Sequence, residues 1–393
     1  MLKKIKIAPL ALAALVIALI VFPRETGVIL GVFAVLSIII VIHEFGHFLV
    51  AKLGGVWVEE FGLGFPPRLL SKKIGDTLYT LNLIPIGGFV RLHGETLEEG
   101  QTAGFPKRSF VNKSALLRIA VALAGIVMNF LLAVVCFTIV YSVIGIQRPK
   151  GDIKITDIKP ASPAQVAGVL PGDQIVSIAG VEVKNTEEVQ KIVAQNLGKR
   201  TVFILKRETN GIKEDKKFTI TPRENPPENE GAVGIEFSQD VETYFPPLWE
   251  RPIYGIKNTI QFTAEVLGGF GQVTRDVAQG KSPEGVVGLP GILGILYKLL
   301  LAGFIPTING VGIISLNLAI FNLLPIPPLD GSRVIFVLAE KVFGRKRLPK
   351  IESMTHTIGF ILLMLLFLAI SGREIGKIIE AGSISNFVDG LIN

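Results

Sequence analysis

Five stretches of the chain contain no charged residue and are long enough, or nearly long enough, to cross a lipid bilayer as helices. A membrane-spanning helix needs about 20 mostly apolar residues. Four of the stretches meet this length once the second is extended to Ala51. The five are Ile7–Pro23, Thr26–Ile42, Ile119–Gln147, Leu299–Leu329 and Ser353–Gly372. Together with a mean hydropathy of +0.52, they predict a polytopic α-helical membrane protein with about five spans.

The first stretch is the shortest, and it follows Lys3, Lys4 and Lys6. A basic start and a short apolar core are also the features of a signal peptide. Because no small-residue cleavage site follows at Val21–Gly27, we interpret this stretch as an extra, uncleaved N-terminal anchor.

Basic residues are concentrated in two segments that flank apolar stretches. Eight lysines or arginines lie between Gly54 and Arg118, and six lie between Gly331 and Glu352. Short basic loops remain in the cytoplasm, so we expect the second span to end there and residues from about 148 to 298 to lie outside. Charges that flank spans and form no recognised binding motif argue against a nucleic-acid partner. The expected partner of these segments is the lipid bilayer.

The second apolar stretch continues into the sequence HEFGH. On a helix, His43 and His47 lie one turn apart on the same face, so both imidazoles can reach one metal ion. Glu44 adjoins them and can take a proton from a water molecule that the metal activates. The alternative is a pair of helix histidines that bond to neighbouring groups. An ionisable cluster in an apolar helix is costly to bury, which favours the metal site.

A catalytic zinc ion needs three protein ligands, and HEFGH supplies two. The remaining histidines are His93, in a polar segment, and His356, at the head of the last apolar stretch. A better candidate is Asp330, which ends a long apolar stretch on the side where HEFGH is expected. The alternative for Asp330 is a turn residue before Gly331, which is a common place for an Asp-Gly pair.

HEFGH in an apolar helix, followed much later by NLLPIPPLDG, resembles the site-2 protease family of intramembrane zinc metalloproteases, of the regulator-of-sigma-E protease type. The segments FGLGFPPRLL, LIPIGGFVRLHGE and LLRIAVALAGIVMNFLLAV are similar to other blocks of that family. The resemblance implies that His43, His47 and Asp330 bind Zn²⁺ and that Glu44 is the general base. It also implies that Asn322 holds the substrate or its oxyanion.

The same resemblance implies a protease of the bacterial inner (plasma) membrane, with its active site towards the cytoplasmic side. Its substrates would be single-span membrane proteins cut in regulated intramembrane proteolysis, such as anti-sigma factors or remnant signal peptides. Two other classes of protein remain as alternatives. A non-catalytic membrane scaffold is disfavoured by the intact HEFGH and Asp330. A transporter is disfavoured because no internal repeat is apparent.

Residues 56–95 contain short β-prone runs separated by glycine and proline, which predicts hairpin-like strands. The family resemblance implies that this region dips into the membrane beside the active site. An exposed strand edge could then pair with an unwound substrate. Glycines would permit close backbone approach there; they are Gly62, Gly64, Gly87 and Gly88. The alternative is a plain cytoplasmic loop with a small sheet.

The segment SPAQVAGVLPGDQIVSIAGVEV closely resembles part of a circularly permuted bacterial PDZ domain. A helix at about Thr186–Gln195 and a strand at Gly231–Phe237 would frame a groove for peptide C-termini. The groove residues expected are Gly231, Val233, Gly234 and Ile235. The alternative role for this domain is a steric filter against substrates with large outer domains.

The expected order of segments combines these predictions. It is an N-terminal anchor (1–25), a transmembrane helix with HEFGH (26–55), a cytoplasmic or re-entrant hairpin region (56–113), a transmembrane helix (114–148), an extracytoplasmic α+β PDZ domain (149–240), amphipathic and short apolar gating segments (241–298), a transmembrane segment with LDG (299–331), a basic cytoplasmic loop (332–352), a last transmembrane helix (353–372) and a C-terminal tail (373–393).

Overall fold

A computed structural model of the protein describes residues 20–95, 107–209, 211–227, 230–280, 287–343 and 348–392. The chain separates into two compact units. We call Met1–Val143 with Pro247–Asn393 the helical unit, and Ile144–Pro246 the β-rich unit. The predicted N-terminal anchor falls largely outside the described residues, because these begin at residue 20.

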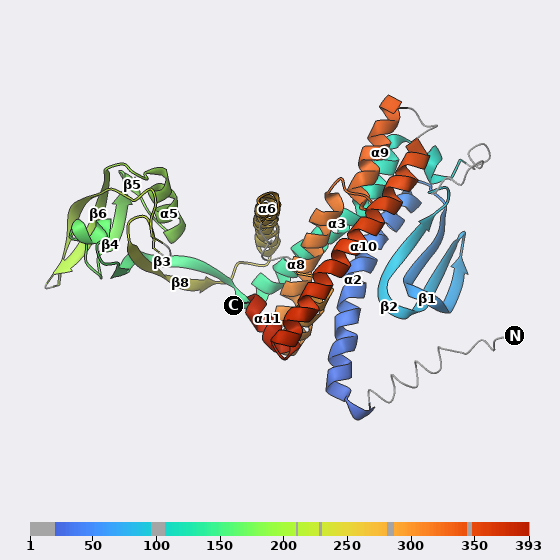
Figure 1. The fold of residues 1–393 in the computed structure, drawn as a ribbon, viewed down its shortest axis with the longest axis horizontal. Helices are drawn as coiled ribbons and strands as arrows, with labels where there is room; N and C mark the ends of the chain where they lie inside the picture. Colours follow the sequence, from blue (N-terminus) through green and yellow to red (C-terminus); the bar gives the residue numbers. More distant parts are fainter. Residues whose placement is uncertain are drawn as a thin grey trace. The chain divides into compact units, whose positions relative to one another are not determined.

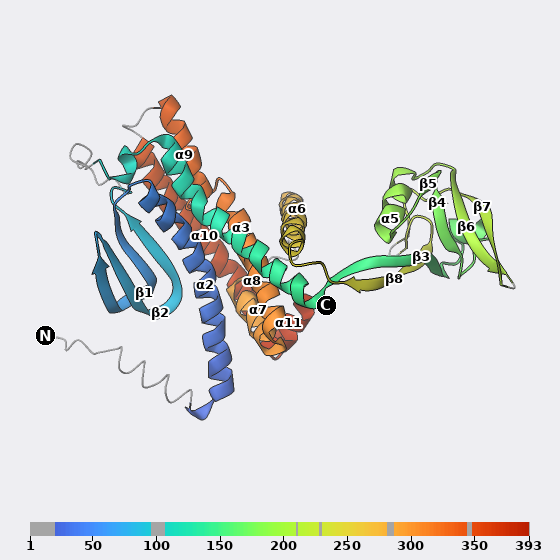
Figure 2. The ribbon, with the colours of Figure 1, turned by 180° about the vertical axis from the view of Figure 1, so that it is seen from behind.

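Four helices of the helical unit are long and apolar enough to cross a membrane. They run in similar directions (Figure 1 and, from behind, Figure 2) and comprise α2 (Pro23–Leu53), α3 (Ala115–Ile144), α8 (Phe304–Leu323) and α10 (Leu348–Glu380). Close approach between α2 and α3 depends on Gly46, where a Cβ atom would lie 2.4 Å from the backbone oxygen of Ala124. Small residues at such contacts are typical of helices that pack within a bilayer.

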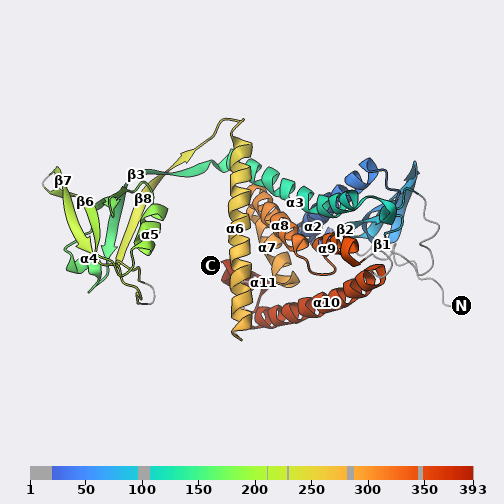
Figure 3. The same cartoon turned by 90° about the horizontal axis from the view of Figure 1, so that it is seen from above.

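Four further helices complete the helical unit among the described residues: α6 (Arg251–Ala278), α7 (Leu289–Ala302), α9 (Asp330–Phe343) and α11 (Ile384–Ile392). Helix α6 covers the predicted amphipathic segment and runs crosswise to α3 and α8 (Figure 3). It packs on the long helices through aromatic contacts, and the rings of Phe262 and Phe137 stack with centroids 5.4 Å apart.

Several segment boundaries differ from those predicted. Residues 299–331 are not one continuous helix: α7 ends at Ala302, Gly303 adopts φ +114°, and α8 begins at Phe304. Such a positive φ is accessible mainly to glycine, which explains the break inside an apolar run. The expected basic loop (332–352) is largely helical in its described part, because α9 extends to Phe343 and α10 begins at Leu348. The expected tail (373–393) contains the end of α10 and all of α11.

The predicted hairpin region forms two long antiparallel strands, β1 (Val58–Ile74) and β2 (Thr77–Leu92). Both strands fold back on themselves, so Gly62 in β1 is paired with Phe89 and also with Thr80. The curled sheet lies beside α2 (Figures 1 and 2). A side-chain contact joins the two, because the Gly87 N–H donates to Ser37 Oγ of α2 over 3.3 Å. A short 3₁₀ helix, η1 (Phe110–Asn112), precedes α3.

The β-rich unit is built around a six-stranded sheet. Five of its strands follow the order β7-β6-β4-β3-β8, and the sixth, β5, pairs with β4. Its elements are β3 (Ile146–Ile158), α4 (Pro163–Val166), β4 (Gln174–Ile178), β5 (Val181–Glu182), α5 (Thr186–Gln195), β6 (Thr201–Thr209), β7 (Ile212–Ile220) and β8 (Ile235–Tyr244). Asn185 caps α5 by accepting the Glu188 N–H over 2.8 Å, and Glu188 in turn accepts the Lys184 N–H. These two hydrogen bonds at the N-terminus explain why the helix begins where the sequence predicts.

The last strand of this unit begins later than expected. The sequence predicts a strand at Gly231–Phe237, but β8 begins at Ile235. Gly234 adopts φ +75°, and its N–H donates to the Gly231 carbonyl over 3.0 Å. The residues before Ile235 therefore form a turn, which an extended strand cannot contain.

Candidate metal centre

His43 and His47 project from the same face of α2, as their spacing predicts. Their Nε2 atoms lie 3.1 Å apart. Asp330, the first residue of α9, brings Oδ2 to 3.0 Å from His43 Nε2 and 3.4 Å from His47 Nε2. Three groups from two distant parts of the chain therefore meet at one point.

The triangle of donor atoms has the dimensions of a metal site. Ligand atoms at about 2.0–2.1 Å from a tetrahedral ion such as zinc lie about 3.3 Å from one another. The three separations above fall close to this value. Two imidazoles and one carboxylate also match the ligand types of catalytic zinc sites, which leave a fourth position open. Among the described residues, His43, His47 and Asp330 form the one group suited to hold a metal ion.

The second ring nitrogen of each histidine determines whether Nε2 is free for a metal. His47 Nδ1 lies 2.7 Å from the Val121 carbonyl of α3, so Nδ1–H donates and Nε2 keeps its lone pair. His43 Nδ1 lies 3.3 Å from the amide of Asn129, a residue with no exposed surface.

The orientation of the Asn129 amide completes the argument for His43. Nδ2 of Asn129 faces the ring, and Oδ1 is buried without a hydrogen-bond partner among the described residues. The two ends of an amide have the same shape and are assigned from their hydrogen bonds. With Oδ1 facing His43, the ring donates from Nδ1 to this oxygen, which leaves Nε2 free for a metal. Both histidines then present Nε2 to the same point, as a metal requires.

A glycine of α3 makes room for the two rings. A Cβ atom on Gly125 would lie 2.5 Å from His47 Nε2 and 2.8 Å from His43 Nε2. Gly125 and Asn129 are one turn apart and share a face of α3. The sequence analysis did not single out either residue. A polar residue in the middle of the apolar stretch Ile119–Gln147 was the available signal for Asn129.

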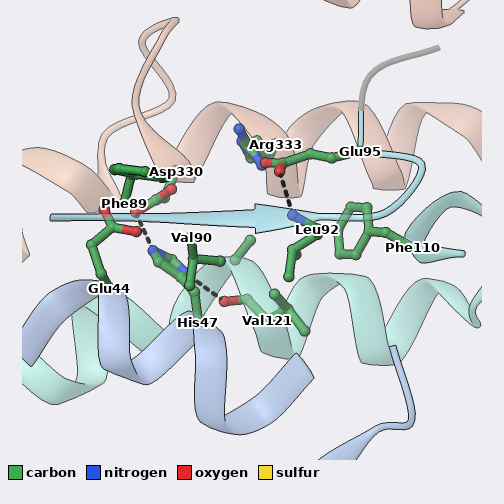
Figure 4. A pocket seen from close by; sticks show the side chains of 11 residues that line it. Glu44, His47, Phe89, Val90, Leu92, Glu95, Phe110, Val121, Asp330 and Arg333 are labelled. Atoms are coloured by element: carbon green, nitrogen blue, oxygen red, sulfur yellow. Dashed lines mark hydrogen bonds and ion pairs between the residues drawn. The ribbon is translucent and has the colours of Figure 1, made fainter. Parts of the chain in front are cut away.

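Glu44 extends from α2 into a cavity of about 200 Å³ that adjoins the cluster (Figure 4). At its other end, Arg333 of α9 donates to Glu95, which follows β2. The cavity is lined by Glu44, His47, Phe89, Val90, Leu92, Glu95, Phe110, Val121, Ala122, Asp330 and Arg333. A carboxylate that lies beside the three candidate ligands and faces a polar cavity can transfer protons to and from water. Arg333 and Glu95 are further residues of this cavity that the sequence analysis did not identify.

The turn before α9 brings Asp330 to the histidines. Gly331 allows α9 to start against the end of α8, since a Cβ atom there would lie 2.2 Å from the Leu323 carbonyl oxygen. Asn322, in the last turn of α8, is half-buried and is not among the residues that line the cavity. The role of Asn322 in holding the substrate or its oxyanion stays a prediction.

The four glycines of the hairpin region have close packing partners. A Cβ atom on Gly88 would lie 3.2 Å from Val41 Cγ2 of α2 and 3.8 Å from Glu44 Cγ, so β2 passes directly beside the general-base candidate. Gly87 adopts φ +79° and faces Ile40. Gly62 and Gly64 lie inside the sheet, where a Cβ atom would meet Phe89 at 2.4 Å and the Ile84 carbonyl oxygen at 2.4 Å, respectively.

The predicted peptide-groove residues lie at the start of β8 in the β-rich unit. The Val233 side chain is 3% exposed and packs in the core of the unit. The carbonyl groups of Val233 and Gly234 accept from Ala164 and Lys159 within the unit. Gly231 and Ile235 lie on either side of this turn, with Ile235 as the first residue of the strand.

Comparison with known proteins gives consistent matches over most of the chain. The sequence matches the profile of Peptidase family M50 over residues 31–366. A Clostridium acetobutylicum protein described as a zinc metalloprotease is 34% identical over 339 residues, which cover 86% of this chain and 94% of the relative. The zinc metalloprotease RasP of Oceanobacillus iheyensis is 28% identical over 428 residues, covering 87% of this chain and 97% of the relative. The profile match includes both HEFGH and Asp330.

Proposed function

Because the chain belongs to peptidase family M50, we propose that it is a membrane-bound zinc endopeptidase in which His43, His47 and Asp330 hold the metal and Glu44 is the general base. The observation that carries the proposal is the triangle of His43 Nε2, His47 Nε2 and Asp330 Oδ2, with separations of 3.0 to 3.4 Å. Zinc rather than another divalent ion is supported by the ligand set and by the names of the relatives.

Each residue has a distinct task in peptide-bond hydrolysis. The chemistry that bound zinc supplies is polarisation of the scissile carbonyl and acidification of water. Glu44 accepts the proton of the attacking water and passes it to the leaving amide nitrogen. Val121 and Asn129 orient His47 and His43 through their Nδ1 atoms. The cavity gives water a route to Glu44 that is lined by protein rather than by lipid.

The substrates proposed are single-span membrane proteins, cut within or near the bilayer during regulated intramembrane proteolysis. Anti-sigma factors and remnant signal peptides are substrates of this kind. HEFGH lies in a helix that is long and apolar enough to span a membrane, which supports cleavage at membrane depth. A helical substrate must unwind first, because its backbone is otherwise hidden in its own hydrogen bonds.

Strand β2 is the proposed clamp for the unwound substrate. Phe89, Val90 and Leu92 of this strand line the cavity beside Glu44. An extended peptide that pairs with this part of β2 would place its backbone next to the metal cluster. Gly87 and Gly88 support the proposal because they let β2 approach α2 closely.

The β-rich unit is proposed to be a permuted PDZ domain that takes peptide C-termini or excludes bulky substrates. Strand β8 is at the end of the sheet order, and α5 packs against it. This arrangement supports a groove between α5 and β8. Because the Gly234 N–H already bonds to Gly231 within the turn, a peptide would pair with β8 from Ile235 onwards.

The proposed topology has five spans, of which the first is the N-terminal stretch, with HEFGH and both basic segments towards the cytoplasm. The β-rich unit would then lie on the opposite side of the inner membrane. The support is the fourteen lysines and arginines in segments 54–118 and 331–352, which favour the cytoplasmic side.

The test is a cleavage assay with the purified full-length protein in detergent and a model single-span substrate. We expect cleavage by the parent protein and none by Glu44→Gln, with about one zinc ion bound to each. Asp330→Asn should lose most of its zinc. Cleavage by Glu44→Gln would contradict the assigned base. If the parent binds no metal and remains inactive after zinc is restored, a non-catalytic scaffold becomes the better description.

A further inference from the structure

The turn that carries Asp330 has little regular structure of its own. It lies between the end of α8 at Leu323 and the start of α9 at Asp330. Prolines at positions 325, 327 and 328 remove backbone donors from it. A metal ligand must nevertheless be held to within about 0.5 Å, which requires neighbouring groups to support it. The groups that hold this turn in place therefore affect how the metal is bound.

Helix α10 packs directly against this turn. A Cβ atom on Gly359 would lie only 2.1 Å from the backbone oxygen of Pro327. His356, three residues earlier on the same face, brings Nε2 to 3.2 Å from Ser332 Oγ in the first turn of α9. The His356 ring also contacts the ring of Phe336, with centroids 5.7 Å apart.

The direction of the hydrogen bonds follows from Ser332. Its side chain is buried, and its Oγ lies 2.7 Å from the Leu329 carbonyl oxygen. A hydroxyl has one proton, and here that proton is donated to Leu329. Ser332 Oγ must therefore accept from His356 Nε2–H. The chain of bonds runs from His356 through Ser332 to Leu329, and it spans the backbone on both sides of Asp330.

This contact is not a by-product of general packing along α10. Residues 360–369, which follow directly, are all exposed in the described structure. The next buried polar contact of α10 is near its other end, where Glu374 accepts the N–H groups of Gly288 and Gly291 over 2.7 and 3.1 Å. Among the described residues, helix α10 thus makes polar side-chain contacts with the rest of the helical unit at two separate places, and one of them is at the ligand turn.

We propose that His356 is a positioning residue for Asp330, which acts through Ser332 to fix the ligand turn against α10. His356 is one of the two histidines that the sequence leaves for a third metal ligand; in the structure it lies behind the turn that supplies the ligand instead. The inference rests on the proposed metal role of Asp330. Supporting groups of this kind change metal affinity by about 10- to 100-fold when removed.

The experiment measures metal affinity of the full-length protein in detergent by competition with a chelator, with Zn²⁺ and with Co²⁺. The visible spectrum of bound Co²⁺ reports the geometry of its ligands. The variants are His356→Ala, His356→Gln, Ser332→Ala and the double variant His356→Ala with Ser332→Ala. Glu374→Gln is the matched control, since it removes the charge from the other polar contact of the same helix.

We expect His356→Ala to weaken metal binding about tenfold and to alter the Co²⁺ spectrum. His356→Gln should recover most of the affinity because its amide can donate to Ser332. The double variant should be no weaker than the worse single variant, since both residues act through one bond. Glu374→Gln should bind metal as the parent does.

Two results would overturn the inference while leaving the proposed function intact. One is parental affinity and spectrum in His356→Ala. The other is an equal loss in Glu374→Gln, which would indicate general loosening of α10. A parent protein that binds no metal would contradict the proposed function itself, and with it this inference.

Discussion

The β-rich unit has one core of buried apolar side chains, whereas a long helix of the helical unit exposes a continuous run of them. In the β-rich unit, Phe203 and Leu205 are each 1% exposed and lie in a conventional core. In the helical unit, Phe360 and Leu362 of α10 are 52% and 62% exposed. The hydrophobic effect can stabilise the first unit in water. It cannot hold lipid-facing helices together, because lipid is as apolar as the side chains.

Beside buried apolar side chains such as Phe137, the interior of the helical unit also relies on small and polar residues. Gly46 and Gly125 allow α2 and α3 to approach closely. The Ser315 hydroxyl of α8 donates to the Asn129 carbonyl of α3 over 2.9 Å. The candidate metal centre is built from these same contacts. In the helical unit, contacts that bring α2, α3 and α8 together therefore lie next to the candidate metal ligands.

The largest effect on stability is expected in the core of the β-rich unit. Phe203→Ala removes a fully buried ring and should lower the free energy of unfolding of this unit by about 3–5 kcal/mol. Hydrogen exchange of the β6 amides in the full-length protein measures this change. The metal affinity of the helical unit should stay unchanged. A parallel loss of metal would refute the separation of the two units.

The next effect in size is expected at Gly125. Gly125→Ala places a methyl group within 2.8 Å of both ligand nitrogens. The rings or α3 must then shift, and metal affinity should fall about 100-fold, which corresponds to about 2.7 kcal/mol. Gly268→Ala in α6 is the matched control, because a Cβ atom there meets nothing within 4 Å. That control should bind metal normally and gain up to about 1 kcal/mol of helix stability.

A smaller loss is expected from Asn129→Ala, which removes the side chain beside His43 Nδ1. Metal affinity should fall about tenfold, because the ring is no longer held in the tautomer that frees Nε2. Asn317→Ala is a suitable control, since the Asn317 side chain donates within its own helix, to the Ile313 carbonyl of α8 over 2.9 Å. Equal chelator resistance in the parent and Asn129→Ala would show that His43 needs no such support.

Local sequence determined much of what could be predicted. The family and the enzyme class, predicted from HEFGH and NLLPIPPLDG, are confirmed by the profile match. The i, i+4 spacing of His43 and His47 was sufficient to place both rings on one face. Helix α5 begins at Thr186 as predicted, because its cap is formed by residues next to it.

The features that were missed depend on contacts between distant segments. Asn129 is 86 residues from His43, and nothing near Asn129 indicates that its amide faces an imidazole. Arg333 and Glu95 are separated by 238 positions. The break at Gly303 is a local feature, but an isolated glycine in an apolar run is as consistent with a continuous helix as with two.

The smallest effect is expected from a Phe→Ala substitution in the helical unit. Phe360→Ala on α10 removes as many atoms as Phe203→Ala, but from a side chain that is 52% exposed. In a bilayer this ring contacts lipid in both the folded and the unfolded state, so the change in unfolding free energy should stay below about 0.5 kcal/mol. Thermal unfolding in lipid nanodiscs, with both variants measured side by side, checks the contrast. A loss of several kcal/mol would mean that Phe360 packs against protein in the bilayer, and α10 would then be fixed by more than its contacts at His356, Gly359 and Glu374.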